Sequence, residues 1–262
     1  NLPDSSIVDG SENFNTVPYT GDGATSQNIT GTGFTPDFVW IKNRTLGDDH
    51  VLQDSVRGVG INSTLISNLS NEEGSSYSTP YGYVSALNTN GFSVAKGTDS
   101  TYGNRWVNEN SSNYAAWNWK AGGTAVSNTD GDITSQVSAN TTAGFSVVTY
   151  TGNGGTGTVG HGLGAAPTMV IIKNRSQADG WYVYHKYNGA GAFGYLFLNS
   201  NDVTRSSTPQ FGSTVPSSSV ISLTRNTYDW ANASSENYVA YCFADVEGYS
   251  KFGSYTGNGS AD

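Results

Sequence analysis

Cysteine is nearly absent from this sequence, which contains only Cys242 among its 262 residues. A single thiol cannot close an intramolecular disulfide, so the chain is not a disulfide-stapled scaffold. Cys242 aligns with Asn118 in an earlier copy of the repeat described below. Because a catalytic nucleophile would not be replaced by asparagine in a second copy, we expect Cys242 to be a small, half-buried thiol.

Charge is also scarce: charged residues make up 13% of the chain, and the net charge is −9. Twelve basic residues without a basic cluster give no footprint for a nucleic-acid backbone or an anionic membrane surface. No apolar run reaches the roughly 18 residues that a membrane-spanning helix needs. The sequence therefore predicts a protein that binds no nucleic acid and does not insert into a membrane.

Motifs for catalysis and metal binding are missing as well. His50, His161 and His185 show no HxH or HExxH spacing, so a zinc site is unsupported. The segment 128–132 carries oxygen ligands in a turn but lacks the full ligand series of a calcium loop, and an Asp-Gly hairpin turn is preferred. With no P-loop, dinucleotide fingerprint or G-x-S-x-G elbow, we predict no enzyme activity, no metal and no cofactor.

Two acidic clusters leave a hydrolase as an alternative. Asp48, Asp49 and Asp54 form one cluster, and the Glu-Glu pair at 72–73 forms the other. A glycosidase needs two carboxylates that face each other across a cleft. The second copy of the repeat keeps only Asp179 near the first cluster and no acid at the second. This loss argues against a duplicated catalytic site, while a single active copy stays open.

Repetition is what the chain has in abundance. The motif Tyr-Thr-Gly-Asp/Asn-Gly occurs at 19–23, at 150–154 and again at 255–259. The block Ile-Lys-Asn-Arg at 41–44 returns at 172–175, with the same offset as the first two motifs (150 − 19 = 131). A fixed offset over a long stretch indicates tandem modules.

The repeat also sets the expected domain boundaries. No signal peptide is visible at Asn1, and we expect the native polypeptide to continue past Asp262. The predicted divisions are a linker or the end of a preceding module at 1–13, a first repeat at 14–123, a connecting segment at 124–144, a second repeat at 145–248, and the start of a further repeat at 249–262.

Strand signals within each repeat are short and regularly spaced. The apolar runs 37–42 and 168–173 each follow a proline and end in Lys-Asn-Arg, which is typical of a central strand buried on both faces. No window shows sustained helical periodicity, and the chain has 33 glycines. The sequence predicts an all-β fold of two tandem antiparallel β-sandwich modules, jelly-roll or concanavalin-like. Further strands are expected at 91–94, 114–119, 220–223 and 238–243.

Aromatic residues give the best recognition signal. The segments 51–113 and 186–237 differ between the copies, and variable loops usually carry recognition. We expect several of their aromatic residues to be exposed, where the rings could stack on a sugar or anchor a protein. The candidate ligand-binding residues are Trp106, Trp181, Trp230 and Tyr182, which lie in or near these segments, as do Tyr77, Tyr81, Tyr83, Tyr184 and Tyr187.

Two other features have a binding interpretation and a structural one. Trp117 and Trp119 point to one face of their strand, either as a sugar platform or, preferably, as a core pair between two sheets. Lys42-Asn43-Arg44 could grip an acidic glycan, but a turn is preferred, with the cations in solvent or paired with nearby Asp.

Several segments are specific enough to carry a family resemblance. They are Ala-Trp-Asn-Trp-Lys-Ala-Gly-Gly at 116–123, Gly-Leu-Gly-Ala-Ala-Pro at 162–167, Tyr-Val-Ala-Tyr-Cys-Phe-Ala at 238–244, and the segment 246–259 with its Tyr-Thr-Gly-Asn-Gly. Together they resemble a repeat of virion proteins from marine tailed bacteriophages that infect cyanobacteria and other ocean bacteria. The resemblance implies an extracellular, tail-fibre-like virion component built from tandem β-sandwiches, and it supplies no catalytic residue.

From the resemblance and the repeat we expect a virion structural protein of tail-fibre or adhesin type, located on the virion surface. Its modules would attach to a host-surface glycan. Its partners would be other virion proteins and further copies of itself, for example in the trimers common among fibres, because repetition offsets weak single contacts. Two alternatives stay open: a capsid decoration or assembly protein without a receptor, and a carbohydrate-binding module of a secreted enzyme.

Overall fold

The computed structural model describes residues 7–190, 194–206, 210–212, 214–224 and 231–259. Over these ranges the chain is all-β, and its helical turns are two short 3-10 segments, η1 (Gly10–Glu12) and η2 (Ile61–Ser63). No helix in the described ranges has the length and apolar character needed to cross a bilayer.

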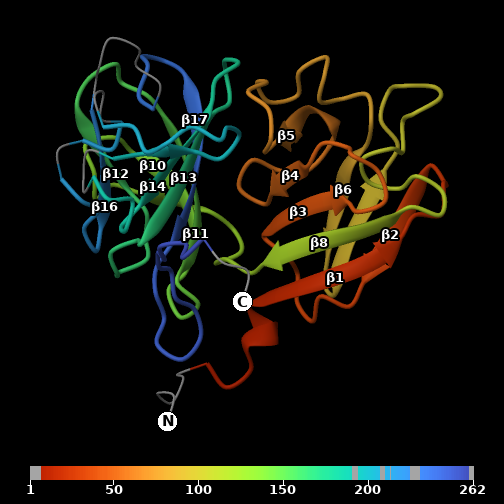
Figure 1. Ribbon diagram of the computed structural model, residues 1–262, viewed down its shortest axis with the longest axis horizontal. Coiled ribbons are helices and arrows are strands. Elements are labelled where there is room, and N and C mark those ends of the chain that lie inside the picture. The colour runs from red at the N-terminus through yellow and green to blue at the C-terminus, as the bar shows by residue number, and fades with distance from the viewer. Residues whose placement is uncertain (1–6, 191–193, 207–209, 213, 225–230, 260–262) are drawn as a thin grey trace.

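The N-terminal half, residues 7–123, forms two antiparallel sheets (Figure 1). The larger sheet has the strand order β1-β8-β3-β4-β5, and the smaller has the order β2-β7-β6. The strands are β1 (Phe14–Thr20), β2 (Ser26–Thr30), β3 (Phe38–Asn43), β4 (Val51–Asp54), β5 (Leu65–Ile66), β6 (Tyr83–Asn88), β7 (Gly91–Ala95) and β8 (Asn113–Trp119).

The C-terminal half, residues 124–259, follows a related plan. Its larger sheet has the order β15-β14-β13-β17-β11-β10-β9, and its smaller sheet pairs β12 with β16. The segment 124–144 therefore does more than connect, because it supplies β9 and β10 to the larger sheet. The strands are β9 (Val126–Asn128), β10 (Ser135–Asn140), β11 (Phe145–Thr151), β12 (Gly157–Gly160), β13 (Met169–Asn174), β14 (Trp181–His185), β15 (Leu196–Phe197), β16 (Val220–Leu223) and β17 (Asn237–Phe243).

The predicted central strands are confirmed, and the packing explains their continuous apolar pattern. β3 lies between β8 and β4, and β13 lies between β17 and β14. Val39 and Ile41 of β3 belong to the core beneath the small N-terminal sheet, while Phe38 belongs to a core shared with the other half. Both faces of the strand are therefore covered, which removes the polar alternation of a half-exposed strand.

The two larger sheets pack against each other through their outer faces, so the molecule has a third core between its halves. This core joins Phe38, Leu52 and Leu65 to Trp181 and Tyr241, among others. The rings of Phe38 and Tyr241 stack with centroids 4.3 Å apart. Figure 1 shows the result: the larger sheets lie side by side at the centre, and the small sheets lie on the outside.

Of the aromatic pair of the closing strand β8, Trp119 packs against this third core rather than inside its own sandwich, and Trp117 reaches it only through Trp40. Trp119 packs against the third core, within 6.1 Å of the ring of Phe243. Trp117 is half-buried and meets Trp40 edge to face at 6.2 Å. The core preferred from the sequence is present, but it lies between the two halves, because Tyr114 and Ala116 occupy the face toward the small sheet.

Cys242 is completely buried in the C-terminal core, so the expectation of a half-buried thiol was wrong in degree. It lies on β17 between Tyr241 and Phe243 but points to the opposite face, as strand alternation requires. Burial raises the pKa of its thiol to about 12. A thiol of this kind is inert.

Candidate functional site

The aromatic residues singled out from the sequence lie inside the protein. Trp106 is 3% exposed, Trp181 is 0% exposed and Tyr182 is 1% exposed, so the predicted exposure of these three was wrong. Trp230 lies outside the described residues. The buried rings have structural partners, which explains why aromatic residues are needed at these positions.

Trp181 fastens the C-terminal half to the N-terminal half. Its indole Nε1 donates to the carbonyl oxygens of Ile66 at 2.9 Å and Leu69 at 3.0 Å. Its neighbour Tyr182 faces the opposite way, into the C-terminal core, and its hydroxyl donates to Asp179 at 2.9 Å. Burial and the adjacent Asp179 raise the pKa of Tyr182. Both side chains are committed to packing and are not available to a ligand.

The repeated tyrosines form the same stacked pair in both halves. Tyr19 lies on Tyr114 with ring centroids 4.9 Å apart, and Tyr150 lies on Tyr238 at 5.0 Å. The hydroxyls of Tyr19 and Tyr150 each donate to a loop carbonyl, that of Val107 in one half and Ala231 in the other, at 2.7 Å. The repeat is therefore explained by a scaffold that holds the loop before the closing strand.

In each half, an asparagine of the loop before the closing strand binds the Tyr-Thr-Gly-Asp/Asn-Gly motif. The backbone N–H of Asp22 donates to Asn108 Oδ1 at 3.0 Å, and Asn108 Nδ2 donates back to Asp22 at 2.8 Å. Asn153 and Asn232 exchange the same two bonds at 3.0 and 2.8 Å. The Gly-Asp/Asn-Gly motif is thus one side of a two-bond clasp, which we call the Asn clasp, and not a ligand site.

The turn interpretation of Lys-Asn-Arg is confirmed in both copies. The side-chain oxygen of Asn43 accepts from two following backbone N–H groups, and that of Asn174 does the same. Arg44 is exposed and Arg175 pairs with Glu73, in line with the expectation of cations in solvent or paired with an acid, but Lys173 departs from it. Lys173 is 0% exposed, and its Nζ donates to three carbonyl oxygens, the shortest bond being 2.7 Å to Asn174. Burial lowers the pKa of Lys173 to about 8.

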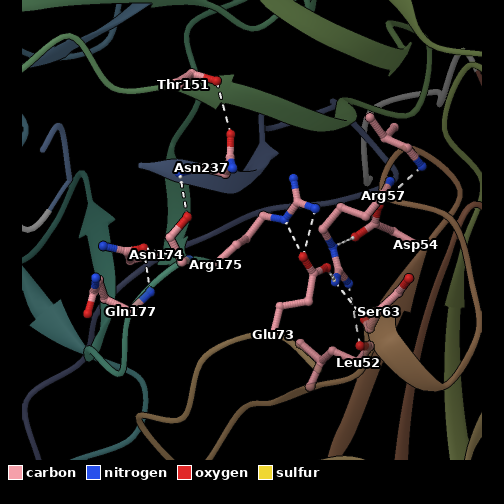
Figure 2. Close-up of polar contacts among 12 residues, drawn as sticks. Leu52, Asp54, Arg57, Ser63, Glu73, Thr151, Asn174, Arg175, Gln177 and Asn237 are labelled. Atoms are coloured by element: carbon pink, nitrogen blue, oxygen red, sulfur yellow. Dashed lines mark hydrogen bonds and ion pairs between the residues drawn. The ribbon is translucent and has the colours of Figure 1, made fainter. Parts of the chain in front are cut away.

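Three of the acidic residues, Asp48, Asp54 and Glu73, are paired with arginines, and the last two lie at the contact between the halves (Figure 2). The buried guanidinium of Arg57 lies 2.5 Å from Asp54 and 2.5 Å from Glu73. Glu73 also contacts Arg175 of the C-terminal half at 2.7 Å, and Tyr241 donates its hydroxyl to Asp54 at 2.8 Å. These five residues, the Arg57 network, join β4 and the segments near it to β13 and β17.

The Arg57 network has the chemistry of a structural joint. Burial opposes the charge of Arg57, but Asp54, Tyr241 and Glu73 outweigh it and raise the pKa of the guanidinium. Asp54 and Glu73 both lie against this cation, so they do not form the open carboxylate pair of a glycosidase. Asp48 is likewise held by Arg105 at 2.6 Å.

The best candidate for recognition is an aromatic surface on three loops of the N-terminal half. These loops join β3 to β4, β5 to β6 and β7 to β8. Tyr77 is 44% exposed and Tyr102 is 52% exposed. Tyr77 is supported from below by Tyr81 at 6.3 Å and by the buried Trp106 at 5.8 Å. We call the two exposed rings and their supports the Tyr77 surface.

Polar groups of fixed geometry surround these rings. Asp49 accepts from the Tyr77 hydroxyl at 2.9 Å and from Asn68 Nδ2 at 2.6 Å. Arg105, 43% exposed, holds its guanidinium 5.8 Å from the ring centre of Tyr102. Exposed flat rings beside planar amide, carboxylate and guanidinium groups suit a polar, ring-shaped ligand, because one face can stack while the edges hydrogen-bond.

Trp106 and Tyr77 are among the loop aromatics expected from the sequence, whereas Tyr102, Asn68 and Arg105 are not. Asp99 lies three residues before Tyr102, and its carboxylate accepts from the backbone N–H groups of Thr101 and Tyr102. These two bonds close a turn that ends at Tyr102. The Asp-x-x-Tyr spacing was a signal that could have located the exposed ring.

A recess of about 190 Å³ lies where the two halves meet, near η1. Its walls are mostly aromatic, and its polar side chains are occupied: Asn13 accepts from Asn140 at 2.8 Å, and Ser250 donates to the Ala244 carbonyl at 3.4 Å. This recess suits an apolar group rather than a sugar. Its aromatic lining consists of Phe14, Trp119, Phe145, Phe243, Tyr249 and Phe252.

Metal binding finds no support in the side-chain arrangement. Among the residues that the structure describes, no three His, Cys, Asp or Glu side chains gather as ligands. His161 is buried, with its ring nitrogens near the Ser217 carbonyl and the Leu163 N–H. His50 is half-buried, and burial together with Lys42 lowers its pKa.

Comparison with known proteins gives a family without an assigned activity. The family described as "Domain of unknown function (DUF7483)" matches residues 9–262. No curated protein and no solved structure matches the chain.

Proposed function

We propose that this chain, which belongs to the DUF7483 family of domains of unknown function, is a non-catalytic virion protein of tail-fibre or adhesin type. In this proposal two tandem β-sandwich modules, followed by the start of a third repeat, form a rigid unit on the virion surface. The unit attaches to a glycan of the host cell through the Tyr77 surface.

The observation that carries the proposal is two exposed rings on these loops: Tyr77, supported by the packed rings of Tyr81 and Trp106 and bonded to Asp49, and Tyr102, which lies against the guanidinium of Arg105. A supported ring stacks on a sugar without losing side-chain entropy at the moment of binding. Binding through one such surface is weak, so a homo-oligomer, for example a trimer, would supply the avidity that adsorption needs.

The test is a glycan array probed with the purified chain, followed by titration of the strongest neutral or acidic oligosaccharide. The double substitution Tyr77→Ala with Tyr102→Ala is expected to weaken that binding at least about tenfold, because two stacking faces are lost. Tyr255→Ala is the matched control, since Tyr255 is 95% exposed and contacts no other ring among the described residues, and it should bind like the wild type.

Two results would count against the attachment proposal. One is equal binding by the double variant and the wild type. The other is an array without any hit when the chain is presented at high valency on beads. The thermal midpoint of the double variant should stay close to that of the wild type, which separates lost binding from lost fold.

A capsid decoration or assembly protein is the second candidate, favoured by the apolar recess at the junction of the halves. A recess lined by rings such as Trp119 and Phe252 suits an apolar side chain of a neighbouring subunit. A cryo-EM map of the intact particle distinguishes the two roles. Attachment requires the Tyr77 surface to face solvent at the tip of a tail appendage, whereas assembly places the recess and the loops against neighbours.

A further inference from the structure

One arginine beside the Tyr77 surface has an outer edge without a partner in the protein. Arg105 donates from Nε to Asp48 at 2.6 Å, and its guanidinium lies 5.8 Å from the ring centre of Tyr102. Among the residues that the structure describes, neither terminal nitrogen of Arg105 has a hydrogen-bond acceptor. The side chain is 43% exposed while Asp48 is buried, so the terminal nitrogens form the side of the guanidinium that a ligand can reach.

The guanidinium is held in one orientation from behind. Asp48 also accepts from Nδ2 of the buried Asn43 at 2.9 Å, so the acceptor for Nε is fixed. The backbone of Arg105 is fixed as well, because its N–H donates to the Tyr102 carbonyl and its carbonyl accepts from the Tyr114 hydroxyl, both at 2.9 Å. An arginine fixed on its Nε side presents its terminal nitrogens as a planar fork, which matches the two oxygens of a carboxylate.

The acidic groups on the same loops already accept bonds from the protein. Asp49 accepts from Asn68 on one carboxylate oxygen and from the Tyr77 hydroxyl on the other. Asp99 accepts from two backbone N–H groups. Burial and Asp49 raise the pKa of the Tyr77 hydroxyl, whereas Arg105 lowers it, so the guanidinium and this exposed ring act on each other. The fork therefore offers unpaired donors beside acids that already have donors, which favours a ligand that brings acceptors.

A second arginine shows the contrasting case, in which the fork is occupied. Arg205 is 51% exposed and lies 5.6 Å from the ring centre of Phe197, an arrangement like that of Arg105. However, Arg205 donates from Nη2 to Asp202 at 2.7 Å, so an acid of the protein already takes one of its terminal nitrogens. Exposure and ring contact are similar in the two arginines, and of the two Arg105 alone keeps both terminal nitrogens for a ligand.

We propose that Arg105 is the acid-binding residue of the Tyr77 surface, and that the ligand is an oligosaccharide that contains a uronic acid. The uronate carboxylate binds the two terminal nitrogens of Arg105, while a sugar ring of the same oligosaccharide stacks on Tyr77. This inference rests on the proposed attachment function and specifies the class of its ligand. It also explains why a chain with a net charge of −9 would keep an unpaired cationic fork beside exposed rings.

The test compares acidic oligosaccharides with their neutral counterparts. The chain, presented at high valency on beads, is titrated with oligosaccharides of galacturonate, glucuronate and mannuronate, each paired with the same compound after its carboxyl groups are reduced to alcohols. At least one uronate should bind about tenfold more tightly than its reduced form, because reduction removes a charge-assisted pair of hydrogen bonds. Arg105→Gln should lose this preference, and Arg205→Gln, the matched control, should keep it.

A second variant covers the case in which Arg105→Gln does not fold, as judged by near-UV circular dichroism. Arg105→Lys keeps a cation beside Asp48 but has no planar fork, so it should also lose most of the preference. Preference retained by the Arg105 variants would overturn the proposal. So would a sulfated galactan that binds more tightly than every uronate.

Failure of this inference is distinguishable from failure of the attachment proposal. Equal binding of the uronates and their reduced forms, with the dependence on Tyr77 and Tyr102 intact, would overturn the role of Arg105 and leave attachment to a neutral glycan standing. Absence of binding to any glycan would overturn both.

Discussion

The two halves agree in the parts that hold their loops and differ where they meet each other. The stacked pair Tyr19–Tyr114 has the same geometry as Tyr150–Tyr238, with ring planes tilted by 13° and 11°. At the contact between the halves, equivalent positions diverge. Trp117, opposite Thr16 in the register of β1, corresponds to Tyr241, whose hydroxyl enters the Arg57 network.

The residues shared by both copies therefore build the scaffold of each half, while the residues that differ between the copies determine how the two halves pack together. Two identical faces would pair as readily between molecules as within one. A face that offers Asp54 and Glu73, and a partner that offers Tyr241 and Arg175, recognise each other and not themselves. Asymmetry at the joint therefore favours the intramolecular pairing.

The largest expected effect comes from breaking the joint at Arg57. Arg57→Met leaves the buried Asp54 without a cation and leaves Glu73 with Arg175 alone. We expect the free energy of unfolding to fall by about 3–5 kcal/mol, as for other buried pairs that lose one partner. Chemical denaturation measures this loss.

The control for Arg57→Met is Arg205→Met, which removes an ion pair whose two side chains are 51% and 44% exposed. Because both side chains face solvent, this pair should contribute little, and Arg205→Met should lower the free energy of unfolding far less than Arg57→Met does. Equal losses in the two variants would show that the Arg57 network does not hold the halves together.

The next effect concerns the buried Lys173 and depends on pH. Its pKa in the folded protein is about 8, below the ordinary lysine value of 10.5 that applies to the unfolded chain. Between these values the unfolded chain holds more protons, so the free energy of unfolding should rise as pH increases from about 8. The contribution of Lys173 to this rise should reach about 2 kcal/mol by about pH 9.5, given about 1.4 kcal/mol per pKa unit, while Cys242, whose thiol pKa burial raises to about 12, opposes it above about pH 9 in wild type and variant alike.

Denaturation of wild type and Lys173→Met at several pH values between 7.5 and 9.5 checks this linkage. The variant should lack the rise. The window stays below pH 10 because buried tyrosines such as Tyr150, whose pKa burial raises, oppose the effect at higher pH. Parallel pH profiles for wild type and variant would contradict the assignment.

A smaller pair of effects compares the Asn clasp in the two halves. Asn108→Ala and Asn232→Ala each remove the same reciprocal bonds to a loop backbone and side chain. Each should lower the free energy of unfolding by about 1–3 kcal/mol, because buried groups lose their partners. Denaturation should give similar losses, and a loss confined to one variant would mean that the two clasps are not equivalent.

The smallest effect is expected from exchanging the one residue that differs between the two clasps, which is Asp22 in one half and Asn153 in the other. In Asn153→Asp the side-chain oxygen can still accept from Asn232, as Asp22 accepts from Asn108. The free energy of unfolding should change by less than about 0.5 kcal/mol. Thermal denaturation of Asn153→Asp and Asp22→Asn checks this, and a change above about 1 kcal/mol in either would show that the loops need different charges.

Much of the fold could be predicted because the signals are local. The apolar runs at 37–42 and 168–173 became the central strands β3 and β13, and the Lys-Asn-Arg blocks became turns. Periodicity and turn chemistry act within a few residues, so a single sequence displays them. The strands β9 and β10 in the Ser/Thr/Asn-rich segment 124–144 were missed because that composition is also typical of a connecting segment.

The candidate site was predicted less well, since exposure is decided by packing over long sequence distances. Trp181 is buried because Ile66 and Leu69 of the other half accept its N–H. Trp106 is buried beneath Tyr77 and Tyr81. The pattern of residues along one strand cannot show that the outer face of its sheet is also buried, because that face is covered by the other half of the chain.

The pairing of β1 with β8 has a consequence for synthesis of the chain. Phe14 pairs with Trp119, so the first sheet cannot close until its last strand has left the ribosome. Until Tyr241 also emerges, Arg57 and Asp54 lack part of their shielding from water. Contacts so distant in sequence form slowly, and incomplete sheets expose edges that aggregate. A nascent chain halted after β8 would thus present a finished sandwich with an apolar outer face, and its solubility would depend on how soon translation resumes.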